Sequence, residues 1–97
     1  MLEVIFTGEF EEDFCEIDEN LFAYWNDASY GERLLLEIKK KLDLIAGFPG
    51  LFAPFWQDVH RFFVVFHGIE YVVFYTVSKT TILAIGMTYS RSDYTNG

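Results

Sequence analysis

The chain has 97 residues, of which 52 % are hydrophobic and 20 % aromatic, so it can bury the core of one domain without disulfides. A single cysteine, Cys15, excludes an internal disulfide, and no Cys or His cluster has metal-ligand spacing, so we expect neither a metal nor a cofactor. The longest apolar run is far shorter than a membrane span requires, which predicts a cytoplasmic protein.

The net charge of −8 is concentrated in one segment. Residues 1–27 contain nine acids and no bases, whereas residues 28–97 contain six acids and seven bases. Such a segment repels phosphate backbones, so we do not expect the whole surface to bind nucleic acid without specificity. It is typical of a solvated helix face, and the alternative is a surface that meets a basic partner.

Residues 2–25 predict one strand and one helix. Residues 2–6 alternate in polarity and end at Thr7-Gly8, as a short strand does when it leads into a helix cap. Apolar residues then recur every three or four positions from Phe10 to Trp25, with acids between them. This pattern predicts an amphipathic helix with an acidic outer face.

A second helix is predicted to begin at Ser29. Ser29 and Glu32 have the spacing of a capping box, and an apolar stripe continues from there to Ile45. Gly47 and Pro49 then supply a stop. The two helices, joined by a short linker, should form an antiparallel hairpin.

The second half of the chain predicts β-structure. Runs of β-branched and aromatic residues indicate strands at 62–66, 69–77 and 81–89. Short turns between them favour antiparallel neighbours. We therefore predict an α+β fold of order β-α-α-β-β-β, a helix hairpin packed on an antiparallel sheet. It forms a single domain over residues 1–97, with a loose tail from about residue 90.

The last three predicted strands are apolar at nearly every position, and Glu70 is the main exception. Both faces of the sheet should therefore lose contact with water. The helix hairpin covers one face, and the other face needs a second cover.

The order of these segments resembles the RelE/ParE toxin superfamily. LEVIFTGEFEEDFCEI resembles its opening strand, cap and first helix, and LLLEIKKKLDLIAGFPGL its second helix with a Pro-Gly turn. VHRFFVVFHGIEYVVFYTV resembles its central hairpin, and MTYSRSDY its last strand and basic end. No single motif is specific, but the resemblance covers nearly the whole chain in order.

The resemblance implies a toxin of a type II toxin-antitoxin module that a cognate antitoxin holds silent in a prokaryotic cytoplasm. Some relatives cleave mRNA on the ribosome, and others poison DNA gyrase. It also implies that an mRNA cleaver is a metal-independent endoribonuclease that uses basic residues in the loop before the second strand, strand arginines and a terminal Tyr or His.

Carrying these roles over gives a sparse catalytic set: Arg61, Arg91, Tyr89 and His60, with His67 as another proton donor. The loop 50–60 contains no Lys or Arg, which departs from the family pattern and counts against phosphodiester cleavage. Each residue also has a plainer interpretation. A strand-end arginine is usually solvated, a turn histidine usually lies at the surface, and Tyr89 could be an aromatic at the edge of the core.

The most unusual segment is residues 48–56, which we call the aromatic loop. Five of its nine residues are large and apolar, although its Pro and Gly residues prevent regular structure. It either covers the core or offers aromatic anchors to another chain. The predicted partner-binding residues are Trp25, Leu51, Phe52, Phe55 and Trp56.

Three functions remain open from the sequence. The leading hypothesis is a toxin that acts by binding its target. The second is a diverged, non-catalytic protein-interaction module of the same fold, and the third is the endoribonuclease.

Overall fold

The computed structural model describes the backbone of residues 1–25 and 29–90 and the side chains of residues 1–19 and 29–90. Its elements, in chain order, are β1 (Glu3–Phe6), α1 (Gly8–Trp25), α2 (Ser29–Gly47), β2 (Val59–Phe66), β3 (Ile69–Val77) and β4 (Thr81–Tyr89). The predicted order of elements is confirmed. Within the described ranges, no helix is long and apolar enough to cross a membrane.

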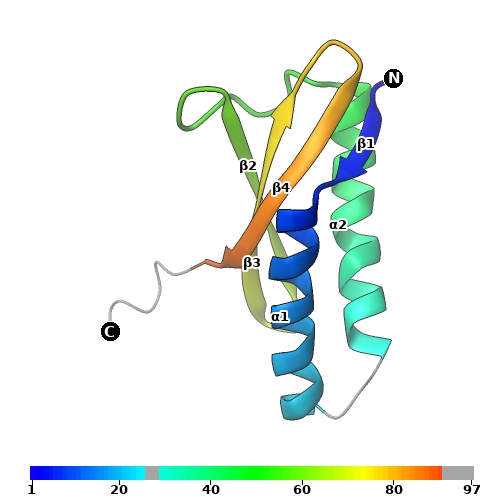
Figure 1. The fold of residues 1–97 in the computed structure, drawn as a ribbon, viewed down its shortest axis with the longest axis vertical. Helices are drawn as coiled ribbons and strands as arrows, with labels where there is room; N and C mark the ends of the chain where they lie inside the picture. The colour runs from blue at the N-terminus through cyan, green and yellow to red at the C-terminus, as the bar shows by residue number, and fades with distance from the viewer. Residues whose placement is uncertain (26–28, 91–97) are drawn as a thin grey trace.

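The four strands form one sheet in the order β1-β4-β3-β2, and α1 and α2 pack on the same face of it (Figure 1). β2, β3 and β4 are antiparallel neighbours, as predicted. β1 lies parallel to β4 at the opposite edge, which makes the sheet mixed. The helix hairpin leads from β1 to β2 at the far edge, and the chain then returns through β3 to β4 beside β1.

The strands β3 and β4 have the predicted bounds, whereas β2 begins at Val59, earlier than expected. The strand begins at Val59 because Val59 pairs with Trp56 in a tight antiparallel bridge. At the other end of β2, His67 and Gly68 both have positive φ, 53° and 80°. These values are typical of the two-residue turn that joins closely paired antiparallel strands.

Thr7 fixes the corner between β1 and α1. Its backbone N–H and its hydroxyl both donate to the carbonyl of Ala84 on β4, at 3.1 and 2.9 Å. The same hydroxyl oxygen accepts from the N–H of Phe10 at 3.2 Å, which is the expected helix cap. One side chain therefore anchors the strand end to the sheet and begins the helix.

The core lies between the two helices and the sheet. Its largest side chains are three tyrosines, Tyr30, Tyr71 and Tyr75, each at most 1 % exposed. Tyr30 is on α2, and its hydroxyl donates to the carbonyl of Phe66 at 3.3 Å and lies 3.4 Å from the Tyr71 hydroxyl. These contacts hold the start of α2 against the end of the β2–β3 hairpin.

A β-bulge interrupts the pairing of β3 with β4 between Phe74 and Tyr75. Tyr75 pairs with Ala84 but Phe74 pairs with Gly86, so Ile85 is the extra residue on β4. The extra residue shifts the alternation of every side chain that follows it on β4.

The outer face of the sheet, away from the helices, is apolar and partly uncovered. On it Phe63 is 42 % and Val65 66 % exposed. Phe55 of the aromatic loop folds back towards this face, with its ring centroid 5.7 Å from that of Phe74. The predicted second cover is therefore present at one end of the face only, within the residues that the structure describes.

Tyr75 offers a test of the core. Its hydroxyl is fully buried and has no hydrogen-bond partner among the described residues. Replacing Tyr75→Phe removes an unpaired polar group without opening a large cavity, so the free energy of unfolding should stay equal or rise by about 1 kcal/mol. Urea denaturation measures this. Tyr30→Phe removes hydrogen-bonded contacts and should instead lower the free energy of unfolding. A clear loss of stability in Tyr75→Phe would show that the Tyr75 hydroxyl does have a partner.

The buried tyrosines also predict alkaline sensitivity. Burial raises the pKa of Tyr71, Tyr75 and Tyr89 above the ordinary value of about 10. The unfolded chain therefore loses these protons first, so the free energy of unfolding is fully present below about pH 10 and falls as the pH rises beyond it. Denaturation between neutral and alkaline pH should show this fall. The free energy of unfolding of Tyr71→Phe should fall less steeply with pH than that of the parent. Equal slopes for the two proteins would count against the prediction.

Candidate functional site

His60, at the start of β2, faces the helix side of the sheet. Its ring lies flat against Tyr75, with centroids 5.0 Å apart, and its Nδ1 donates to the carbonyl of Phe52 at 2.8 Å. A carbonyl can only accept, so this contact fixes the proton on Nδ1. His60 thus ties the aromatic loop to the sheet, which is a structural use of the side chain.

Arg61 is exposed and lies on the outer face of the sheet. Its guanidinium carbon is 4.5 Å from the centroid of the Phe55 ring and 5.4 Å from that of Phe63. Both distances are within the range of cation–π attraction. Arg61 is therefore held between two aromatic rings and becomes part of the surface that the aromatic loop presents.

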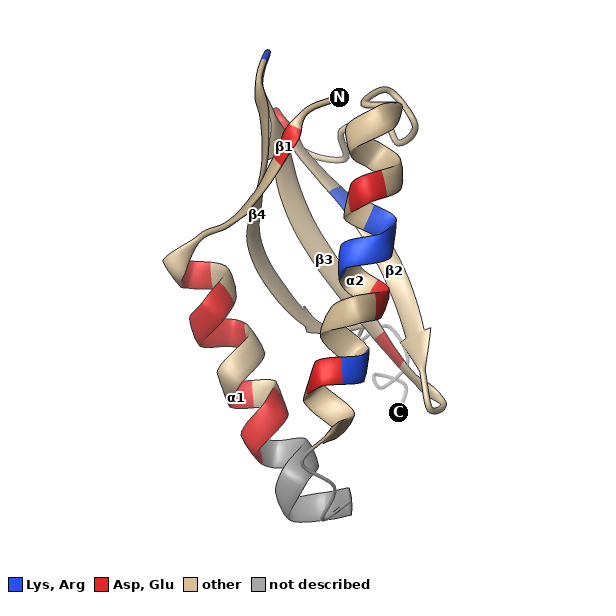
Figure 2. Ribbon diagram, turned by 90° about the vertical axis from the view of Figure 1, so that its right-hand side faces the viewer, with Lys and Arg blue, Asp and Glu red and all other residues tan. Residues whose placement is uncertain are grey.

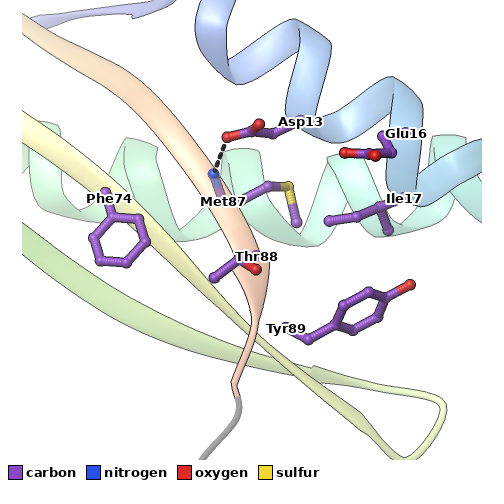
Figure 3. Close-up of a pocket in the computed structure, with 7 residues that line it drawn as sticks. All are labelled: Asp13, Glu16, Ile17, Phe74, Met87, Thr88 and Tyr89. Atoms are coloured by element: carbon purple, nitrogen blue, oxygen red, sulfur yellow. Dashed lines mark hydrogen bonds between the residues drawn. The ribbon is translucent and has the colours of Figure 1, made fainter.

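Tyr89 ends β4 and lines a cavity of about 430 Å³ between α1 and the end of that strand (Figure 3). We call this cavity the acidic pocket, and it is lined by Asp13, Glu16, Ile17, Phe74, Met87, Thr88 and Tyr89. Burial, the neighbouring Tyr30 and the charge of Glu16 together raise the pKa of Tyr89. Among the described residues, the lining contains two carboxylates and no base, which disfavours phosphate there.

The β-bulge places Tyr89 and Arg61 on opposite faces of the sheet. Tyr89 pairs with Tyr71, which is buried on the helix side, whereas Arg61 pairs with Phe74 on the outer face. The described members of the predicted catalytic set therefore do not meet at one point. Arg91 lies outside the described residues.

His67 is exposed in the turn after β2, where its ring packs on Tyr30 and Phe66. It also lies at the opposite end of β2 from His60 and Arg61. In the described part of the chain, no three His, Cys, Asp or Glu side chains gather closely enough to hold a metal ion.

The aromatic loop divides into one inward and several outward side chains. Phe52 is half-buried and packs against the core, while Leu51, Phe55 and Trp56 are 46 %, 45 % and 60 % exposed. The loop therefore combines both predicted roles, since it is fastened through Phe52 and still presents large apolar groups to solvent. The side chain of Trp25 lies outside the described residues.

Two surface hollows flank α1 and were not anticipated from the sequence. On the β4 side lies the acidic pocket. On the α2 side lies an apolar hollow of about 240 Å³, the interhelical groove, which is lined by Phe6, Phe10, Glu11, Phe14, Cys15 and Leu35. The spacing of the acids and aromatics on α1 predicts which residues share a side of the helix, but the depth of each hollow depends on the distance to its neighbours.

Asp13 is the key residue of the acidic pocket that sequence analysis missed. β1 pairs only with residues 81–84 of β4, so the rest of that strand edge needs another partner. The Asp13 carboxylate accepts from the backbone N–H of Met87 at 3.1 Å. Gly86 allows this approach, because a Cβ at that position would lie 3.0 Å from the same carboxylate oxygen.

Removing this carboxylate should cost stability. Asp13→Ala leaves the N–H of the buried Met87 without its partner, so we expect the free energy of unfolding to fall by about 1–3 kcal/mol. Asp13→Asn keeps an acceptor oxygen and should lose less. Glu12→Ala, at an exposed neighbouring position, is the control and should change little. Equal stability of Asp13→Ala and Glu12→Ala in urea denaturation would show that the contact is unimportant.

No curated protein is significantly similar to the chain in sequence. A family model described as the ParE toxin of the type II toxin-antitoxin system, parDE, matches residues 4–90, which span every described helix and strand except the first residue of β1. Together with the helix hairpin on a four-stranded sheet, this match identifies the chain as a member of the RelE/ParE toxin family, the toxin half of type II toxin-antitoxin modules.

Proposed function

We propose that this toxin inhibits growth by binding a protein target, with DNA gyrase as the first candidate, and not by cleaving mRNA on the ribosome. The observation that carries the proposal is the separation of Tyr89 from Arg61. Tyr89 lies in the acidic pocket, and Arg61 lies on the outer face of the sheet. Gyrase is chosen because the family resemblance includes a gyrase-directed branch.

Phosphodiester cleavage would require these groups to work together. An in-line attack needs cationic charge near the phosphate and a proton donor at the leaving oxygen. Tyr89 is a poor donor because its pKa is raised and two carboxylates share its pocket. His60 already donates its Nδ1 proton to the Phe52 carbonyl. These contacts favour a toxin without a phosphodiester active site.

The surface around the aromatic loop supports protein binding. Leu51, Phe55 and Trp56 are all substantially exposed, and Arg61 lies between the rings of Phe55 and Phe63. Trp and Arg are enriched among the residues that dominate the binding energy of protein interfaces. Rigid aromatic side chains also lose little conformational entropy when they become buried. We therefore propose this surface as the contact with the target.

The cognate antitoxin is proposed to bind on the opposite side, along α1. The residues of α1 include seven acids and no base, and Figure 2 shows acids along the described part of the helix. The interhelical groove beside it has an apolar floor formed by Phe6, Phe10, Phe14 and Leu35. A basic amphipathic segment of the antitoxin matches both features. We place the complex in the cytoplasm, where gyrase and ribosomes are found.

Induced expression and a purified gyrase reaction test the proposal. Growth should stop, co-expression of the antitoxin should restore it, and the purified chain should inhibit DNA supercoiling. Tyr89→Phe should retain both effects, because no proton transfer is involved. Trp56→Ala should weaken inhibition about tenfold if the anchor contributes 1–2 kcal/mol. Leu36→Ala, which truncates a 57 % exposed side chain on α2, is the matched control.

Other outcomes would contradict the proposal in different ways. New 5′ ends in ribosome-bound mRNA that disappear when Arg61 and Arg91 are both changed to Ala would establish the endoribonuclease. The absence of growth arrest in a host whose gyrase the purified chain also fails to inhibit would favour the non-catalytic interaction module.

A further inference from the structure

β2 is the outermost strand of the sheet on the side away from β1, and its free edge runs for most of its length. The two-residue turn after Phe66 requires Phe66 and Ile69 to exchange backbone hydrogen bonds, so the even-numbered residues of β2 point their backbone groups towards β3. The odd-numbered residues therefore point theirs to the free edge. Val59 confirms this alternation, because its N–H and C=O bond outward to Trp56 at 2.8 and 3.4 Å.

Three residues of β2 consequently carry free backbone groups: Arg61, Phe63 and Val65. Among the described residues, none bonds to the N–H or C=O of these three on the edge side. β2 has few of the usual protections of an edge strand, since it contains no proline or lysine, carries one charged residue, Arg61, and pairs with β3 without a bulge. Such an edge is a template for another strand.

The charge distribution permits a second copy of the chain to approach this edge. α1, which carries most of the negative charge, contacts β4, and β3 separates β4 from β2. The acids of α1 therefore lie at the β4 side of the sheet, away from the β2 edge (Figures 1 and 2). Two copies that meet through β2 keep their acidic helices far apart, whereas contact through α1 would bring like charges together.

We propose that two copies pair through β2 in antiparallel orientation about a two-fold axis at Phe63, which joins the two sheets into one. In this register Phe63 pairs with the partner's Phe63, and Arg61 pairs with the partner's Val65. All the free backbone groups of the three residues then find partners. This pairing is independent of which target the toxin binds.

The register with the two-fold axis at Phe62 is excluded by contacts within the chain. A two-fold axis at Phe62 would place Val65 opposite the partner's Val59, whose edge groups already bond to Trp56. With the axis at Phe63, the incoming strand ends at its own turn after Phe66, where the Trp56–Val59 bridge begins. The bridge therefore excludes a shift in that direction, and an axis at Val64 is disfavoured because Arg61 would then lie opposite the turn residue 67 of the other copy, where φ is positive.

Charge supports the same register. Val65 is the register neighbour of Glu70 on β3. When Arg61 lies opposite the partner's Val65, its long side chain lies on the same face as the partner's Glu70, one strand further on. Each copy contributes one arginine and receives one carboxylate, so the contact is repeated symmetrically.

The mass of the chain in solution is the first test, measured by light scattering on material made in a cell-free system so that toxicity does not interfere. We expect a dimer that dissociates on dilution. Val65→Lys places a positive charge opposite the partner's Arg61 and should raise the dissociation constant at least tenfold. Val65→Glu places a negative charge there and should leave it equal or lower.

The two variants control for folding. Within one copy Val65 pairs with Glu70, so Val65→Lys should gain an attraction to Glu70 and Val65→Glu a repulsion from it. These effects on the single copy are opposite to the effects expected on the dimer. Loss of the dimer in Val65→Lys, with urea denaturation no weaker than that of Val65→Glu, therefore reports on the interface and not on unfolding. A chain that is monomeric at all accessible concentrations, or equal weakening by both variants, would overturn the proposal.

Cross-linking checks the register. In a Cys15→Ser background, which removes the only native thiol, Phe63→Cys should form a disulfide-linked dimer under mild oxidation. Directly paired Cα atoms lie about 5.5 Å apart, which a disulfide can span. Val65→Cys should not cross-link, because the two copies of that position lie roughly 13 Å apart along the strands. Cross-linking of Val65→Cys without Phe63→Cys would exclude the proposed axis.

Discussion

The contact between Thr7 and the carbonyl of Ala84 determines how the rest of the molecule is arranged. Two hydrogen bonds to one carbonyl end β1 part of the way along β4, and the Thr7 hydroxyl begins α1 at the same point. The helix must therefore cross the remaining edge of β4. There Asp13 replaces the missing strand by accepting from the Met87 N–H. The acidic pocket and the partial burial of Tyr89 both follow from this arrangement.

The two faces of the sheet have different physical properties because of the same arrangement. The helix side is filled with large side chains, including the three buried tyrosines. In the part of the chain that the structure describes, the outer side has only the end of the aromatic loop as cover, and there an arginine lies between two phenylalanine rings. An apolar surface with one stacked cation suits contact with another protein better than contact with a polyanion. The charge on α1 reinforces that preference.

Much of the fold could be predicted because it depends on local patterns. The cap residue Thr7 marks the start of α1, α2 begins at the predicted Ser29, and the bounds of β3 and β4 follow from runs of β-branched and aromatic residues. The parallel pairing of β1 with β4 could not be predicted from periodicity, because two strands far apart in sequence share no local signal. The early start of β2 depends on the Trp56 bridge, which is also a tertiary contact.

The candidate site was less predictable, and the β-bulge shows why. Without the extra residue at Ile85, Tyr71 would pair with Thr88, and Tyr89 would lie on the same face as Arg61. Alternation alone therefore places the two residues together, whereas the actual register separates them. The role of Asp13 was hidden for a related reason, since it depends on where β1 ends and on the absence of a side chain at Gly86.

The unequal distribution of charge also gives the molecule a direction. With seven acids on one helix at one side of the sheet, the chain is a strong electric dipole. In the field of a polyanion such as DNA, it would turn so that α1 faces away and the aromatic loop leads. For the gyrase target proposed above, an enzyme that works on DNA, this orientation would present the apolar anchors during approach and would reduce unproductive encounters.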